Sequence, residues 1–394
     1  MKAQREYGLS LSWARVTTVF LIDVALLVIA SHLPDSWQAG RNLTFWVGVG
    51  LAVILTSVAL LTNGGVPVSS APIARVRNWY ADPEALTVGC TPAIDHRRQF
   101  SRETVGIREF DGQLIAVIAV DGAGDAGRHR HRDAEATIPL EAVVTSLRQF
   151  DVRLDSVDVI SVGTRSAGKG KGVQSAVRDD FGGSGEQRPI EERNTWLVLR
   201  MDPQHNVSAV AARDSVACTL AAATERLAHD LDGRNCAAKP LTADEIVDVD
   251  DAVLAGLQPA HVRPFWRYLK TPDGFVTSFW VSPGDITSET LEQLWSTDAD
   301  VTVLTIRIIA EGHQADVSVW VRYHSDKRLR KEAFSGLNRL TGRQLGAVAA
   351  SLPAPSSRRP LPMPSRTLTT AEEILVPVGA SSGQQAGAAE AALR

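Results

Sequence analysis

A glycine- and lysine-rich segment is the first place in this sequence where chemistry could reside. Residues 163–172 read GTRSAGKGKG, which brings glycine and Lys169 together as a phosphate-binding loop does. The full motif GxxxxGK[ST] does not occur in the chain, because Gly170 follows Lys169 where Ser or Thr is required, and no apolar helix follows the segment. We interpret it as a solvated loop, with a phosphate cradle as the alternative. The sequence also lacks the HExxH and CxxC patterns.

A second candidate is the run GRHRHRD, residues 127–133, which holds His129 and His131 between arginines. Histidines two residues apart share a face only in a strand, and the neighbouring positive charges oppose a metal cation. A metal or phosphate site is therefore the alternative to a basic surface loop. Such a loop would touch anionic lipid or an acidic partner through Arg128, Arg130 and Arg132.

Two further groups of reactive side chains have structural explanations. Asp95 and His96 are half of an acid–base pair, but no nucleophile stands near them in the sequence. The acids of TADEIVDVDDAVL, residues 242–254, lack the offsets of a calcium loop and indicate the acidic start of a helix. The cysteines, Cys90, Cys218 and Cys236, are scattered, which fits a reducing cytosol without a zinc site. We expect no cofactor and no catalytic residue.

Two apolar segments near the N-terminus predict a membrane hairpin. Residues 16–33 and 44–61 each supply about 18 mostly apolar residues, which as helices reach roughly 27 Å, close to the bilayer core. Phe45 and Trp46 open the second segment, where aromatic rings favour the membrane interface. We predict two transmembrane helices within residues 15–62, joined by a short periplasmic loop. A cleaved signal peptide and a buried helical hairpin are the alternatives.

Positive charges predict the orientation of this hairpin in the inner membrane. Lys2, Arg5 and Arg15 precede the first segment and Arg75 and Arg77 follow the second, which places both termini in the cytoplasm. Asp23 lies inside the first segment, where an ionisable residue is costly and calls for a partner. We predict that Asp23 contacts a neighbouring helix, with a proton relay as the alternative.

The remaining residues predict a cytosolic domain of mixed α/β (α+β) structure. The net charge of −4 gives no basic field, so nucleic acid is not an expected partner. We expect a cytosolic N-terminus at 1–14, a linker at 63–104 with Trp79 and Tyr80 as interface or lipid contacts, and the domain at 105–352. A mobile loop is expected at 166–192, and a Pro-rich arm with a disordered tail at 353–394.

Within the domain, strand and helix patterns alternate. Asp111–Gly112 predicts the turn of a β-hairpin, and 156–165, 195–202, 235–240 and the two runs flanking EGHQA predict strands. Helices are expected over 138–151, 207–231, from Thr242 to about 257, and 329–352, with Thr242 and Glu245 spaced as a capping box. The alternation leaves open whether the domain is one sheet or two similar halves.

Several longer stretches resemble a known family. They are MKAQREYGLSLSWARV, CTPAIDHRRQF, RNTWLVLRMDPQ, AATERLAHDLDG, TSFWVSPGDITSETL and RYHSD followed by GLNRLTGRQL. In this order, over nearly the whole chain to about residue 375, they resemble EccE, a membrane component of the mycobacterial ESX, or type VII, secretion machinery. The likeness is greatest to the members that serve the fifth ESX system.

The resemblance implies a structural subunit without enzymatic activity. It implies an inner-membrane complex with EccB, EccC and EccD, in which EccC is the ATPase and this subunit supports assembly, stability and protein export. It supplies no catalytic residues. A membrane-anchored enzyme or a nucleotide or ligand sensor, using His96 or the Gly/Lys segment, is the alternative reading of the same chain.

Overall fold

The computed structural model describes residues 7–9, 13–32, 43–63, 66–67, 74–76, 79, 81–87, 91–99, 101–121, 137–165, 190–213, 215–234, 236–312, 314–329, 336–355, 361, 363–368 and 372–379. The chain divides into two compact units, residues 2–81 and residues 82–394.

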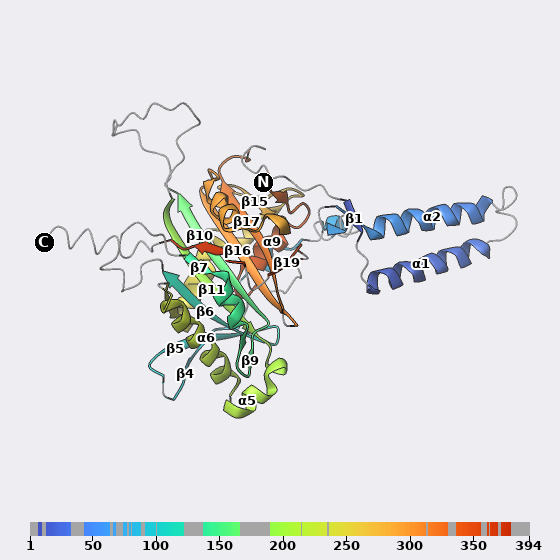
Figure 1. The fold of residues 1–394 in the computed structure, drawn as a ribbon. Helices are drawn as coiled ribbons and strands as arrows, with labels where there is room; N and C mark the ends of the chain where they lie inside the picture. Colours follow the sequence, from blue (N-terminus) through green and yellow to red (C-terminus); the bar gives the residue numbers. More distant parts are fainter. Residues whose placement is uncertain are drawn as a thin grey trace, which may run out of the picture. The chain divides into compact units, whose positions relative to one another are not determined.

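The first unit contains two helices and a small antiparallel sheet (Figure 1). The helices are α1 (Trp13–Ser31) and α2 (Leu43–Leu60), and the strands pair in the order β1 (Tyr7–Leu9), β2 (Leu61–Asn63) and β3 (Val66–Pro67). The two helices pack closely, because a Cβ added at Gly48 would lie 2.7 Å from the Cβ of Ala30. Glycine at this position therefore permits the close approach of α1 and α2.

The second unit is built on one large antiparallel sheet, which has 13 strands within the described residues. Its main path is β13 (Arg263–Pro264), β14 (Leu269–Thr271), β15 (Gly274–Trp280), β17 (Gln314–Ser325), β16 (Val301–Glu311), β10 (Ser156–Arg165), β11 (Ile190–Met201), β6 (Gln113–Asp121), β5 (Thr104–Phe110) and β4 (Ile94–Arg97). Off this path, β12 (Ala237–Pro240) pairs with β6, β18 (Asn338–Arg339) with β15, and β19 (Arg366–Leu368) with β17.

Two halves of this sheet have the same strand order. In the first half the hairpins β5–β6 and β10–β11 join through the pair β6–β11, and in the second the hairpins β14–β15 and β16–β17 join through β15–β17. The third strands of the halves, β10 and β16, pair antiparallel at the centre. The question that the sequence left open is thus resolved, because two similar halves form a single sheet.

Helices cover both faces of the sheet. One face packs on α4 (Leu140–Ser146), α6 (Val216–Asp232), α8 (Ser288–Gln293) and the strand pair β7 (Thr137–Pro139) with β20 (Leu375–Pro377). The other face packs on α7 (Ala243–Leu254) and on α9 (Gln344–Ser351) with the chain that follows it. The sheet is therefore the middle of three layers, which buries strand residues on both sides.

The remaining elements are short. They are the strand pair β8 (Arg148–Gln149) and β9 (Val152–Arg153), helix α5 (Val207–Arg213), and the 3₁₀ helices η2 (Pro83–Leu86), η4 (Pro203–Asn206), η5 (Pro259–His261), η6 (Pro283–Asp285) and η7 (Leu294–Ser296).

Three local predictions from the sequence are confirmed. Asp111 and Gly112 turn the β5–β6 hairpin with φ of 52° and 74°, the two positive values that a tight hairpin turn requires. Glu245 accepts the backbone N–H of Thr242, completing the capping box of α7. The strand expected at 156–165 is β10 with the same bounds.

Other predicted bounds are wrong for identifiable reasons. Within the described part of the range 329–352, the expected helix is reduced to α9, because Gly336 and Gly342 adopt positive φ and residues 338–339 pair with β15. The helix expected over 207–231 is split, since the Ser215 side chain caps a new helix by accepting the N–H of Cys218. The helix expected over 138–151 shrinks to α4 because Ile138 pairs with Val376 of β20.

Strand pairing between distant residues also places parts of segments expected to be irregular in β-sheets. The range 63–104, expected as a linker, contains β4, and the range 353–394, expected as an arm and tail, contains β19 and β20. The strand β11 begins at Ile190, so the mobile loop predicted for 166–192 extends too far. The rest of that predicted loop, 166–189, lies outside the described residues.

Candidate functional site

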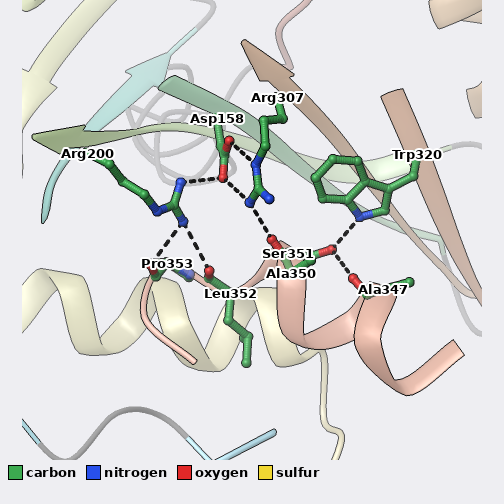
Figure 2. Close-up of polar contacts among 9 residues, drawn as sticks. All are labelled: Asp158, Arg200, Arg307, Trp320, Ala347, Ala350, Ser351, Leu352 and Pro353. Carbon is green, nitrogen blue, oxygen red and sulfur yellow. Dashed lines mark hydrogen bonds and ion pairs between the residues drawn. The ribbon is translucent and has the colours of Figure 1, made fainter. Parts of the chain in front are cut away.

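The most extensive buried polar site lies where three central strands meet α9 (Figure 2). Asp158 of β10 pairs with Arg307 of β16 on one side. On the other side it pairs with Val198 of β11, two residues before Arg200. Arg307 donates from Nε to Asp158 Oδ1 and from Nη2 to Oδ2, both at 2.8 Å, while Arg200 Nη1 also donates to Oδ2. One carboxylate is thus shared by two guanidinium groups.

The same two arginines bind the end of α9. Arg307 Nη2 donates to the carbonyl of Ala350 at 2.9 Å, and Arg200 Nη2 donates to the carbonyl of Pro353 at 3.0 Å. These carbonyls belong to the last turn of the helix or just follow it, where backbone acceptors lack helical partners and the dipole favours positive charge. The arginines therefore join the sheet to the C-terminal end of α9.

Trp320 of β17 extends the contact beside Arg307. Its indole N–H donates to Ser351 Oγ at 3.0 Å, and Ser351 in turn donates to the carbonyl of Ala347 within α9 (Figure 2). The guanidinium of Arg307 lies 5.2 Å from the centre of the Trp320 ring, within the range of a cation–π contact. Three sheet residues from three strands thus hold one short helix.

The electrostatics of Asp158 follow from this geometry. The carboxyl is fully buried, which by itself opposes ionisation, but Arg200 and Arg307 outweigh this effect and hold the pKa of Asp158 below its usual range. The group is therefore ionised at neutral pH. A paired, hydrogen-bonded carboxylate of this kind is an anchor, and its oxygens are already occupied by donors.

Further buried arginines on the same face of the sheet perform related tasks. Arg108 of β5 donates to Asp250 of α7 at 2.5 Å. Arg322 of β17 donates to the carbonyl of Val253 in the last turn of α7, and burial lowers the pKa of its guanidinium to about 9. Buried cations thus contact the C-terminal carbonyls of both helices on this face, α7 and α9.

The first unit holds Asp23, the predicted helix contact. Thr56 of α2 donates its hydroxyl hydrogen to Asp23 Oδ2 of α1, so the carboxyl lies between the two helices. Many apolar side chains of both helices point outward, including Phe20, Ile29, Trp46 and Ile54. Within the described residues, no helix has the length and apolarity needed to cross a membrane.

The other predicted site residues are only partly described. Trp79 is 85% exposed, whereas Tyr80, the histidines of 127–133, and Arg128, Arg130 and Arg132 lie outside the described residues. Asp95 accepts the backbone N–H of Ala243 at 2.7 Å, at the start of α7. The ring of His96 lies 3.1 Å from the sulfur of Cys218. No group of three potential metal-ligating side chains occurs among the described residues.

Sequence reasoning did not identify Asp158, Arg200 or Arg307. Each stands alone as a charge inside an apolar strand run, in SVDVISV, TWLVLRM and VTVLTIRII. A lone charge in a strand buried on both faces needs a partner, and this signal marks all three residues. Their meeting depends on strand order, which local patterns do not provide.

Comparisons with known proteins identify the class. The family model described as "Putative type VII ESX secretion system translocon, EccE" matches residues 190–281, from β11 to β15. The ESX-5 secretion system protein EccE5 of Mycobacterium marinum is 52% identical over 390 residues, covering 96% of this chain and 97% of the relative. EccE5 of Mycobacterium tuberculosis is 51% identical over 393 residues, with the same coverage of both chains.

A more distant relative is the ESX-2 secretion system protein EccE2 of Mycobacterium tuberculosis, 26% identical over 285 residues, or 68% of this chain and 50% of the relative. Similarity at 52% identity over almost the full length of both chains is decisive. The chain belongs to the EccE family of ESX, or type VII, protein secretion systems. The family resemblance predicted from the sequence is thereby confirmed.

Proposed function

We propose that this chain is a non-enzymatic structural subunit of the inner-membrane complex of an ESX secretion system, where it supports assembly, stability and protein export. The observation that carries the proposal is the similarity to ESX-5 secretion proteins over 96% of the chain. The buried charges add physical support. Asp158, Arg200 and Arg307 bind one another and backbone carbonyls, as expected of a rigid scaffold.

We also propose that residues 15–62 form a membrane hairpin with both termini in the cytoplasm; within the described residues neither α1 nor α2 alone has the length and apolarity of a full span, so this proposal stands on the sequence pattern. Its support is the apolar surface of both helices and the positive charges on their outer flanks. Asp23 and Thr56 would then satisfy each other between the helices, away from the lipid. Reporter domains fused at residues 1 and 394 should both be active only as cytoplasmic reporters, and a periplasmic signal from either end would contradict this topology.

The proposed partners are EccB, EccC and EccD, together with membrane lipid. Trp79 is a candidate lipid or subunit contact because its large amphipathic ring is exposed. Tyr80, Arg128, Arg130 and Arg132 are proposed to contribute to the same kind of contact on the basis of residue type alone. Their alanine variants should lower the amount of EccB, EccC and EccD recovered with the tagged chain, without changing the stability of the folded domain.

Deletion of the chromosomal copy tests this function. Without the subunit, the membrane complex should fall to a smaller or less stable particle on a native gel, and export of ESX substrates should drop. Re-expression of the wild-type chain should restore both. Normal assembly and normal export in the deletion strain would refute the structural role.

The alternative function is a membrane-anchored enzyme or a ligand sensor. A cavity of about 440 Å³ beside the β14–β15 turn favours this alternative, because His324 and Ser325 are among its lining residues and their buried side-chain atoms Nε2 and Oγ make no hydrogen bond within the described residues. A sensor would leave assembly intact but lose export when His324 and Ser325 are replaced. If these substitutions instead abolish the membrane complex itself, the result supports the structural role.

A further inference from the structure

Cys218 and His96 form a thiol–imidazole pair that the sequence alone does not reveal. They stand 122 residues apart in the chain, on α6 and on the edge strand β4, yet the cysteine Sγ and the histidine Nε2 are 3.1 Å apart. A nucleophile and a base within hydrogen-bonding distance are the basic unit of cysteine-based nucleophilic chemistry. Cys218 thus supplies the nucleophile that is absent from the sequence around Asp95 and His96.

Cys218 lies where a small reagent can reach its sulfur. The residue lies in the first turn of α6, a helix of 17 residues, and that turn carries no acidic side chain. Cys218 and His96 are each only partly buried, so a small reagent can approach the pair.

Other contacts hold β4 against α6 and α7 around this pair. Arg98, which follows β4, donates to Glu225 of α6 at 2.6 Å, and Asp95 accepts the N–H of Ala243. Arg97 is engaged with the carbonyl of Ser101. The nearby charged groups on β4 and α6 thus have partners of their own, and the Cys218–His96 distance is set by the packing of β4 against the helix.

Cys236 provides a contrast within the same chain. It is 1% exposed, donates its S–H to the carbonyl of Thr137 at 3.1 Å, and burial raises the pKa of its thiol. A buried thiol of this kind is expected to be inert. The structure therefore separates one cysteine that has an accessible base from one that is locked in the core.

We propose that Cys218 is a nucleophilic modification site that undergoes thiol–disulfide exchange with low-molecular-weight disulfides, with His96 as the base. The thiol proton passes to His96 Nε2, and the thiolate attacks one sulfur of the disulfide. A new bond forms between Cys218 Sγ and that sulfur, the original S–S bond breaks, and the second half leaves as a thiolate that takes up a proton. Cys218 is oxidised as the small disulfide is reduced.

The test uses the full-length chain in detergent, treated with glutathione disulfide and quenched with acid at timed intervals. Mass spectrometry of peptides then gives the rate of adduct formation separately at Cys218 and at Cys236. Cys218 should react at least tenfold faster. Equal rates at the two sites, or no adduct at Cys218, would overturn the proposal.

The role of His96 is tested by His96→Gln, which keeps a polar side chain but removes the base. At pH 7 this variant should lower the rate at Cys218 by roughly tenfold or more. A merely structural role predicts the opposite, because loosening β4 would expose the sulfur and raise the rate. His229→Gln, at the exposed far end of the same helix, is the matched control and should leave the rate unchanged. An unchanged or higher rate in His96→Gln would refute the proposed base.

Discussion

Replacing Asp158 by asparagine is the sharpest perturbation of the buried network. Asparagine keeps the shape of the side chain but removes its negative charge and turns an NH₂ group toward guanidinium donors. Arg200 and Arg307 would then share a buried region without a counter-charge. Breaking a buried ion pair by removing one partner typically costs 3–5 kcal/mol. We expect about 3 kcal/mol here, because Arg307 retains partial contact with solvent and both arginines keep their α9 carbonyls.

The assay is thermal unfolding of the full-length chain in detergent, followed by circular dichroism. A loss of about 3 kcal/mol should lower the Tm by roughly 5–10 °C. Asp230→Asn is the matched control, because the same chemical change removes an ion pair to Arg234 in which both side chains are about half exposed. Such surface pairs contribute at most about 0.5 kcal/mol, so the control should shift the Tm by less than about 2 °C.

Two results would refute this reasoning. The first is a Tm for Asp158→Asn that matches the control. If the residues act as one network, Arg200→Met should cost less free energy of unfolding in the Asp158→Asn background than in the wild type. The second refuting result is that the costs of the two substitutions simply add. Equal costs in both backgrounds would mean that Arg200 acts mainly through α9.

Acid stability and strand packing give two further predictions. Because the folded-state pKa of Asp158 is depressed, its contribution is present above the unfolded value near 3.8 and is lost as pH falls through the lower folded value. The stability gap between wild type and Asp158→Asn, measured by urea unfolding, should therefore be constant from pH 7 to 5 and shrink below about pH 4; a constant gap down to pH 2 would contradict this. Gly163→Ala places a methyl group 2.6 Å from the Trp295 ring and should cost about 1–3 kcal/mol in the same assay, whereas Gly284→Ala, with open space around its Cβ, should be nearly neutral. Equal effects of the two glycine changes would argue against the packing of Trp295 on β10.

Local patterns predicted the elements whose cause is local. The Asp111–Gly112 turn and the Thr242–Glu245 cap depend on residues within four positions of each other, and the sequence shows them directly. The prediction of a helix over 329–352 was wrong because contacts with residues distant in the sequence determine the structure of this segment. Gly342 donates its N–H to the carbonyl of Trp266, and Asn338 pairs with Trp280, so tertiary contacts override helical propensity.

The candidate site was hidden for a related reason. Asp158 is 42 residues from Arg200 and 149 from Arg307, and only the central pairing of β10 with both β11 and β16 brings the three together. The Cys218–His96 pair likewise forms across 122 residues. A single charge in an apolar strand indicates that a partner exists, a signal that our sequence analysis did not use, and the identity of that partner depends on sheet topology.

The central claim is that this EccE-family chain acts as a structural part of a larger membrane complex. Native-gel sizing with mass spectrometry of an affinity-tagged copy from detergent-solubilised membranes tests it most directly. The tagged chain should migrate in a very large particle containing EccB, EccC and EccD. Migration as a small free membrane protein, with those subunits absent, would contradict it.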